Sequence, residues 1–181
     1  MEIRFTDPVN DFANGIRVLR TYHDDFIVRG EQLLRLTEAI YKNGMTGSFA
    51  TRCIEIHSYY TRANKLHHQD EEVALFPAIV NQSFLLDGMI ERLTLDHEEI
   101  EETWDELAVM LGNPEQLTGV GKLKRIASEF EKKQREHLVR ENEDFLAHVE
   151  KILGQEQLVT LGKKMAALRG LNNNGELRLA I

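Results

Sequence analysis

Residues 60–80 read YTRANKLHHQDEEVALFPAIV, and this stretch decides how the rest of the chain is interpreted. His67 and Glu71 are four residues apart in a strongly helical run. Positions i and i+4 lie on one face of a helix, one turn apart. The same face continues with apolar residues, namely Ala74, Leu75 and Ala78. Because buried charge is costly unless it is paired or bound to a metal, the stretch predicts an internal site that needs both groups.

A second copy of this unit lies in REHLVRENEDFLAHV, residues 135–149. His137 and Glu141 are again four apart, and the pair Phe145–Leu146 follows His137 at the offsets where Leu75–Phe76 follow His67. Two further histidines, His23 and His97, fall on the apolar stripes of their own predicted helices. Four-helix bundles build metal sites from such facing side chains, so we expect a metal-binding bundle.

Composition limits the alternatives. The 181 residues fit one domain, and the net charge of −8 gives no basic surface for nucleic acid or anionic lipid. No apolar run approaches the ~20 residues that span a bilayer, and the N-terminus lacks a signal-sequence pattern. Cys53 is the single cysteine, so no intrachain disulfide can form. We therefore expect a cytoplasmic protein.

Helix signals divide the chain into five segments. The first helix is expected from Pro8 to Lys42, with Asp7 as its N-cap. Pro77 should kink or end the second helix, and a break is possible at residues 119–121 of the fourth. The remaining predicted helices run from after Ser48 to about Asn81, over 85–111, over 114–153 and over 155–169. Short Gly/Pro connections favour an all-α, up-down-up-down four-helix bundle with a short fifth helix, as one domain over residues 1–170 with a tail at 171–181.

Imidazole and carboxylate ligands suit iron, manganese or zinc, and the lack of inward thiols argues against an iron–sulfur site. Six ligands are too many for one tetrahedral zinc ion, but they suit two metal ions bridged by the glutamates. The alternative is that the buried groups bond only among themselves. Two close carboxylates would then repel, and one should take up a proton.

Four segments resemble the metal-bearing helices of the hemerythrin-like, HHE cation-binding family: LRTYHDDF, HHQDEEVALFP, LTLDHEEIEE and HLVRENEDFL. The resemblance covers about residues 8–153. It implies a four-helix bundle around a non-haem di-iron centre with an oxo or hydroxo bridge, in which the two glutamates bridge the irons. The ligands that it implies are His23, His67, Glu71, His97, His137 and Glu141.

Several neighbouring residues compete for these roles. His68 and Glu72 also stand four apart, but the repeat and the family motif, which places the ligand ten residues before the proline, favour His67. Oxygen-carrying members have a second histidine on the third helix, where this chain has Glu101. Glu101 either ligates a metal or is a surface glutamate. Without a histidine at this position, each iron would keep an open coordination position. His57 and His148 are expected at the surface or beside the ligands.

Members of the family bind dioxygen, sense iron, oxygen or redox state, or act on nitric oxide and iron–sulfur damage. The first hypothesis is a protein that binds dioxygen or a related oxidant for sensing or storage. Its dry pocket would be lined by Ile27, Leu75, Trp104 and Phe145. The second is an enzyme that reduces nitric oxide or peroxide in stress defence, with Trp104 and Tyr60 as electron relays or simply as core residues. The third is a metal-free helical scaffold. The expected partner is a small diatomic ligand, and the chain is expected as a monomer or homodimer.

Overall fold

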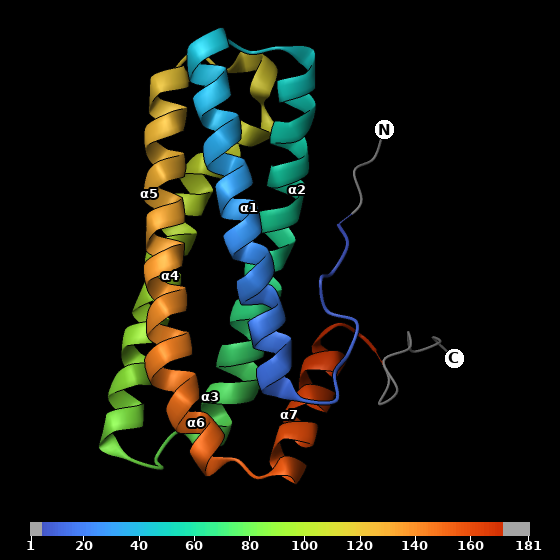
Figure 1. Cartoon of the computed structure of the whole chain (residues 1–181), viewed down its shortest axis with the longest axis vertical. Helices are drawn as coiled ribbons and strands as arrows, with labels where there is room; N and C mark the ends of the chain where they lie inside the picture. The colour runs from blue at the N-terminus through green and yellow to red at the C-terminus, as the bar shows by residue number, and fades with distance from the viewer. Residues whose placement is uncertain (1–4, 172–181) are drawn as a thin grey trace.

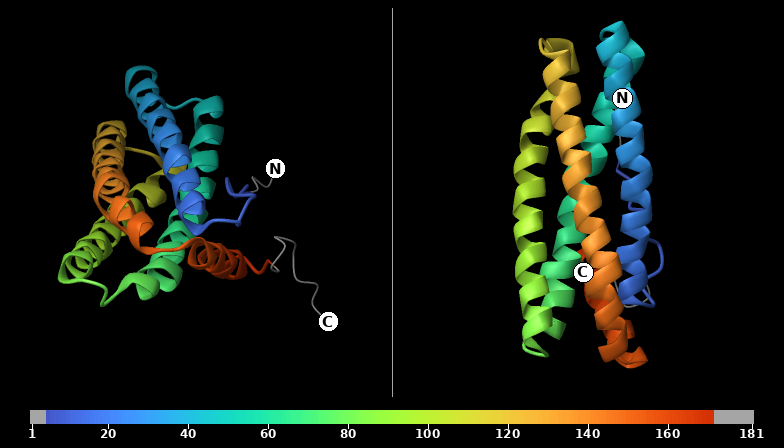
Figure 2. Two further views of the ribbon diagram at one scale, coloured as in Figure 1. Left: turned by 60° about the horizontal axis from the view of Figure 1, so that its bottom comes forward. Right: turned by 60° about the vertical axis from the view of Figure 1, so that its left-hand side comes forward.

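Four long helical segments run up, down, up and down beside one another, and a fifth helix packs against one end of the bundle (Figures 1 and 2). The computed structural model describes residues 5–171. The prediction of an all-α bundle with a short fifth helix is confirmed. The helical elements are α1 (Gly15–Asn43), α2 (Gly47–Gln69), η1 (Asp70–Leu75), α3 (Phe76–Ile79), α4 (Phe84–Gly112), η2 (Pro114–Gln116), α5 (Val120–Val139), η3 (Arg140–Phe145), α6 (Leu146–Ile152) and α7 (Gln155–Leu168).

The helices form a closed ring around a single core. α1 packs on α5 and α2, and α4 packs on α5 and α2, so each helix touches its chain neighbour and the first touches the last. Short connections between antiparallel neighbours produce this arrangement. Within residues 5–171, none of the helices combines the length and the hydropathy that a membrane span requires.

Two helix starts differ from the prediction. α1 begins at Gly15, because Asn14 accepts the Arg17 backbone N–H as the N-cap. Asp7 instead accepts hydrogen bonds from the Val9 backbone N–H and the Tyr22 hydroxyl, both at 2.9 Å. Its carboxylate is used for tertiary contacts, so it does not cap a helix. The fourth long helix begins at Val120, and only a short 3₁₀ turn follows Pro114.

A π-helical turn interrupts each of the two helices that carry the His-x-x-x-Glu unit. The turns are η1 and η3, and in both the glutamate is the second residue. The carbonyl oxygens of Glu71 and Glu141 accept bonds from the N–H groups of Phe76 and Leu146, five residues on. Each turn thus holds one residue more than an α-helical turn, a feature that often marks functional sites.

The extra residue explains the position of the apolar pairs. A residue advances by about 100° around an α-helix, so offsets of 8 and 9 would lie at about 80° and 180° from the histidine. One additional residue in a turn brings them back to about −20° and 80°. Leu75, Phe76, Phe145 and Leu146 are accordingly all buried. The same rotation turns Ala78 to solvent, so the prediction that it faces inward is wrong. Pro77 is the second residue of α3, and the helix ends two residues later at Ile79, as expected for a proline near a helix end.

The fifth helix, α7, packs closely against α1 and η1 (Figure 1). Gly162 is the point of closest approach: a Cβ atom there would lie 2.0 Å from the carbonyl oxygen of Phe12. The neighbouring atom belongs to the backbone, so a side chain has nowhere to go. The tight packing fixes α7 at the end of the bundle that carries both π turns.

We predict that Gly162→Ala lowers the free energy of unfolding by about 1–3 kcal/mol, because overpacking forces the backbone to shift. Gly88→Ala is the matched control, since Gly88 is also in a helix and a Cβ there meets nothing within 4 Å. That control should gain up to about 1 kcal/mol from helix propensity. Urea unfolding of the two variants measures both changes, and equal effects would contradict the tight approach at Gly162.

Candidate metal centre

All six predicted ligand residues meet at one level of the bundle. His23 comes from α1, His97 from α4, and the two His-x-x-x-Glu units cross from α2 into η1 and from α5 into η3. Every one of the six is at most 2% exposed. They form two overlapping groups whose ligand atoms lie within 4.8 Å of one another. The first group is His23, His67, Glu71 and Glu141, and the second is Glu71, His97 and His137.

Glu71 is the residue that joins the two groups. Its Oε1 lies 2.8 Å from His67 Nε2, and its Oε2 lies 2.9 Å from His97 Nε2. The second carboxylate, Glu141, points its Oε2 at His23 Nε2 from 2.9 Å and lies 3.7 Å from His137 Nε2. Each carboxylate therefore faces histidines of both groups, which is the arrangement that a bridge between two ions needs.

The convergent atoms are close but do not satisfy one another. Among residues 5–171, the buried atoms without a hydrogen-bond partner include Nε2 of all four histidines and both carboxylate oxygens of Glu71 and Glu141. Buried polar groups are otherwise nearly always hydrogen-bonded, so a cluster of such atoms requires an explanation. Lone pairs on nitrogen and oxygen that point at shared space fit cations, and the donor set fits iron, manganese or zinc.

Charge interactions within the cluster oppose the effect of burial. Burial alone would raise the pKa of Glu71, but His67 and His97 hold it well below its usual range. Burial would likewise lower the pKa of His97, but Glu71 and Glu72 raise it to about 10. For His67, burial outweighs the neighbouring carboxylate, and its pKa is lowered. The Glu71 carboxylate thus remains ionised and able to bind a cation.

Two of the histidines are oriented by a polar partner on their outer nitrogen. His23 Nδ1 donates to Asn142 Oδ1 at 2.9 Å, and His97 Nδ1 donates to Glu72 Oε1 at 2.6 Å. His137 Nδ1 has no hydrogen bond, although the Asp96 carboxylate lies 3.5 Å from it. Such partners fix the tautomer that presents Nε2 to a metal. Sequence reasoning did not identify Asn142 or Asp96, although each is adjacent in sequence to a predicted ligand.

The competing residues take outer positions. His68 Nδ1 pairs with Glu101 at 2.8 Å, and its ring stacks on the His97 ring with centroids 4.0 Å apart. Glu101 is 57% exposed and belongs to neither group of metal-binding residues. This geometry favours His67 over His68. The last two histidines, His57 and His148, lie away from the cluster: one packs near Trp104, and the other bonds the Asp144 carbonyl.

The predicted apolar pocket is right in part. Leu75 and Phe145 are buried beside the two glutamate-bearing turns. Ile27 is 36% exposed and lies at the edge of the buried stripe of α1, so its assignment to the pocket is wrong. Trp104 is seven residues from His97, about two helical turns away, where it packs on Tyr60 and Phe130. It belongs to the aromatic core above the ligands.

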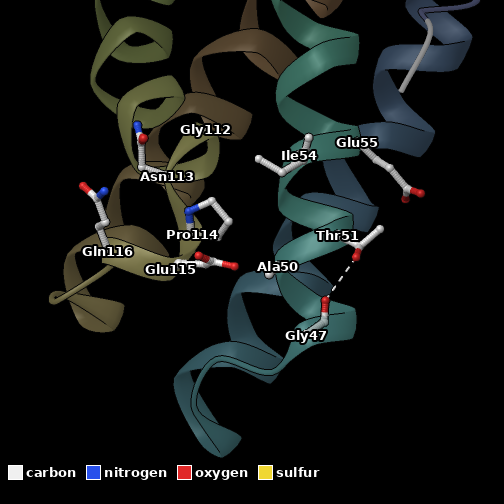
Figure 3. Close-up of a pocket in the computed structure, with 10 residues that line it drawn as sticks. All are labelled: Gly47, Ala50, Thr51, Ile54, Glu55, Gly112, Asn113, Pro114, Glu115 and Gln116. Atoms are coloured by element: carbon white, nitrogen blue, oxygen red, sulfur yellow. Dashed lines mark hydrogen bonds between the residues drawn. The ribbon is translucent and has the colours of Figure 1, made fainter. Parts of the chain in front are cut away.

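A surface pocket of about 600 Å³ opens at the other end of the bundle, between the start of α2 and the end of α4 (Figure 3). Its lining includes Gly47 and Gly112. Gly47 is twenty residues from His67 along the helix, roughly 30 Å at 1.5 Å per residue. This pocket is therefore separate from the metal-binding residues.

Asp96 links the cluster to two arginines. Its carboxylate lies 2.5 Å from Arg92 and 2.9 Å from two nitrogens of Arg140, the first residue of η3. Burial would raise its pKa, but the neighbouring His137 and Arg140 lower it to about 2. An acid whose pKa falls on folding stabilises the protein above its unfolded pKa, and this contribution is lost as the pH falls through the folded value.

We predict that Asp96→Asn in metal-free protein costs about 2 kcal/mol at pH 6, from the difference between a pKa near 2 and the ordinary 3.8. The cost should shrink as the pH falls below about 4, because the carboxylate of the unfolded protein then takes up a proton, and it should be lost by about pH 2, where the folded carboxylate does so too. Urea unfolding of both proteins at several pH values measures this difference. A cost that stays constant between pH 6 and pH 3 would show that the charge of Asp96 is not responsible.

Comparison with known proteins agrees with this geometry. A sequence model of the hemerythrin HHE cation binding domain matches residues 14–149, a range that contains all six clustered residues. An uncharacterized protein of Haemophilus influenzae is 36% identical over 80 residues, which cover 44% of this chain and 46% of that protein. The match thus spans about half of that relative. No solved structure shows a significant match. Because the family match extends over most of the chain, the protein belongs to the hemerythrin HHE cation-binding family.

Proposed function

We propose that the chain holds two iron ions between the two groups of buried side chains and uses them to bind dioxygen or a related small oxidant. The observation that carries this proposal is the convergence of buried, unpartnered nitrogen and oxygen atoms from four helices. The ligands would be His23, His67, Glu71, His97, His137 and Glu141.

Two ions, and iron in particular, fit the donor set best. Six residues exceed the four ligands of a structural zinc site, while carboxylates that face two histidines each are suited to bridging. Imidazole nitrogen and carboxylate oxygen are ligands that iron accepts, and within residues 5–171 the only cysteine, Cys53, is not among the clustered residues. When bound, a reduced iron pair supplies electrons singly to a small oxidant.

The two groups differ in the number of residues that they offer. The first has four and the second has three: Glu71 is common to both, whereas Glu141 lies nearer to His23, at 2.9 Å, than to His137, at 3.7 Å. An ion held by fewer protein ligands keeps more positions for an outside molecule. We therefore place the small-molecule position at the ion beside His97 and His137. Apolar side chains exclude water there: Phe76 stacks on the His97 ring with centroids 6.1 Å apart, and Phe145 packs edge-on against Phe76.

A second candidate function is the reduction of nitric oxide or peroxide, and one observation favours it. Two half-exposed glutamates reach buried histidines on this side of the cluster: Glu72 contacts His97, and Glu101 contacts His68. Polar groups that join solvent to a buried site suit a reaction that consumes protons. A binding or sensing protein has no need of such a connection.

We predict that protein reconstituted anaerobically with ferrous iron retains two irons per chain, and that His67→Ala retains at most one. His68→Ala is the matched control, because His68 is equally buried and adjacent but belongs to neither group. It should retain two irons. Metal analysis after gel filtration measures all three proteins. Full retention by His67→Ala together with loss in His68→Ala would contradict the assigned ligand.

We predict that the reduced, loaded protein forms a dioxygen adduct that survives for seconds or longer and releases dioxygen intact under vacuum. The reason is the apolar packing of Phe76 and Phe145 beside His97, which limits the access of solvent to a bound molecule. Stopped-flow absorption of the loaded protein measures formation and release. Immediate oxidation without an adduct, combined with turnover of nitric oxide or peroxide by added reductant, would instead support the enzyme.

A further inference from the structure

The guanidinium group of Arg169, at the end of α7, is buried against the metal-bearing end of the bundle. Its side chain is 6% exposed. Its five N–H groups have five hydrogen-bond acceptors at 2.7 to 3.2 Å: both carboxylate oxygens of Asp70, one of Asp7, the Met165 carbonyl and the Tyr22 hydroxyl. An arginine can donate all five of its N–H groups only where the acceptors are held in fixed positions.

The Asp70 carboxylate depends on this arginine. Asp70 is 0% exposed, and both of its oxygens accept from Arg169 at 2.7 Å. Removing one partner of a buried ion pair leaves the other charge uncompensated, which is strongly unfavourable. Asp70 is the first residue of η1 and immediately precedes Glu71. The position of the π turn that carries Glu71 is thus tied to a side chain on the fifth helix.

We propose that Arg169 is a positioning residue of the metal centre. Through its paired hydrogen bonds to Asp70 it fixes the π turn η1, and so aims the Glu71 carboxylate at both groups of histidines. Tyr22, whose hydroxyl accepts from the same guanidinium, precedes His23, so the arginine also borders the α1 ligand. The inference deepens the proposed function, on which it rests for its effect on iron.

The second π turn shows the same device and supports the inference independently. Arg140, the first residue of η3, is held by Asp96 on α4, and Glu141 follows it directly. In both copies the residue that opens the π turn forms an ion pair with another helix, although the charges are reversed between the copies. Both π turns are thus anchored by an ion pair at their first residue, although different residues form the pair in each turn.

The test measures iron loss to a ferrous chelator from wild-type protein, Arg169→Ala and Arg169→Lys. Partners that orient metal ligands typically change metal affinity by 10–100-fold when they are removed. We expect iron release from Arg169→Ala to be at least tenfold faster, and Arg169→Lys to restore part of the difference because lysine keeps the charge but not the fork. The single variant Asp70→Ala completes a double-mutant cycle. The double variant Asp70→Ala/Arg169→Ala should release iron no faster than the faster of the two single variants, because both residues act through one contact.

A control separates positioning from loss of stability. Leu111→Ala removes a fully buried side chain at the end of α4 that lies next to the distant pocket, so it destabilises the bundle without touching η1. It should keep the wild-type rate of iron release. Equal acceleration in Leu111→Ala and Arg169→Ala would overturn the proposal, as would an unchanged rate in Arg169→Ala.

A readout without iron keeps the inference separate from the proposed function. In metal-free protein, the amide of Phe76 is protected by its bond to the Glu71 carbonyl inside η1. Hydrogen exchange at this amide should accelerate at least tenfold in Arg169→Ala and stay unchanged in Leu111→Ala. If wild-type protein binds no iron, the proposed function fails, and this exchange result alone decides whether Arg169 fixes the turn.

Discussion

Two carboxylates buried completely among four imidazoles are the constraint on which this structure depends. Glu71 and Glu141 are each 0% exposed and face histidines rather than solvent. A buried carboxylate must be compensated, and a buried polar network that is only partly satisfied is less stable than an apolar core. The proposed pair of cations at the centre would satisfy all the convergent atoms at once. The bundle is then required to bring one histidine from each of its four long segments to the same level, which sets how the helices align.

The π turns allow the polar ligand residues and the apolar residues that follow them to face the same core. The His-x-x-x-Glu spacing keeps both ligands on one face within the regular helix, but the apolar pair at offsets 8 and 9 would then diverge from that face. One extra residue per turn rotates the pair back into the core. Both copies use this solution, and the second has Ala147 where the first has Pro77, so the proline is not its cause. A local departure from ideal helix geometry at a functional site is a recurring compromise.

The sequence was sufficient for the features that periodicity encodes. Helical spacing places His23, His67, His97 and His137 on inward faces, and the structure brings these residues together with both glutamates. Features that depend on contacts between distant residues were not predictable. Asp7 resembles a helix cap but binds Arg169, 162 positions away. Ile27 fits the apolar stripe of α1, yet it lies at the stripe's edge and is 36% exposed. The π turns do leave a signal, because the offsets of 8 and 9 in both repeats do not suit an unbroken α-helix.

The two halves of the centre are held by different parts of the fold. The turn that carries Glu141 is anchored by Asp96, inside the four-helix ring, whereas the turn that carries Glu71 is anchored by Arg169, from α7 outside the ring. Glu71 is also the residue common to both metal-binding groups. A displacement of α7 would therefore disturb both groups of metal-binding residues through one carboxylate while leaving the ring of long helices intact. The backbone of α7 at Gly162 packs directly against the backbone at Phe12, where there is no room for even a Cβ atom. This close packing limits how far α7 can shift. The fifth helix thus contributes to the centre without supplying a ligand.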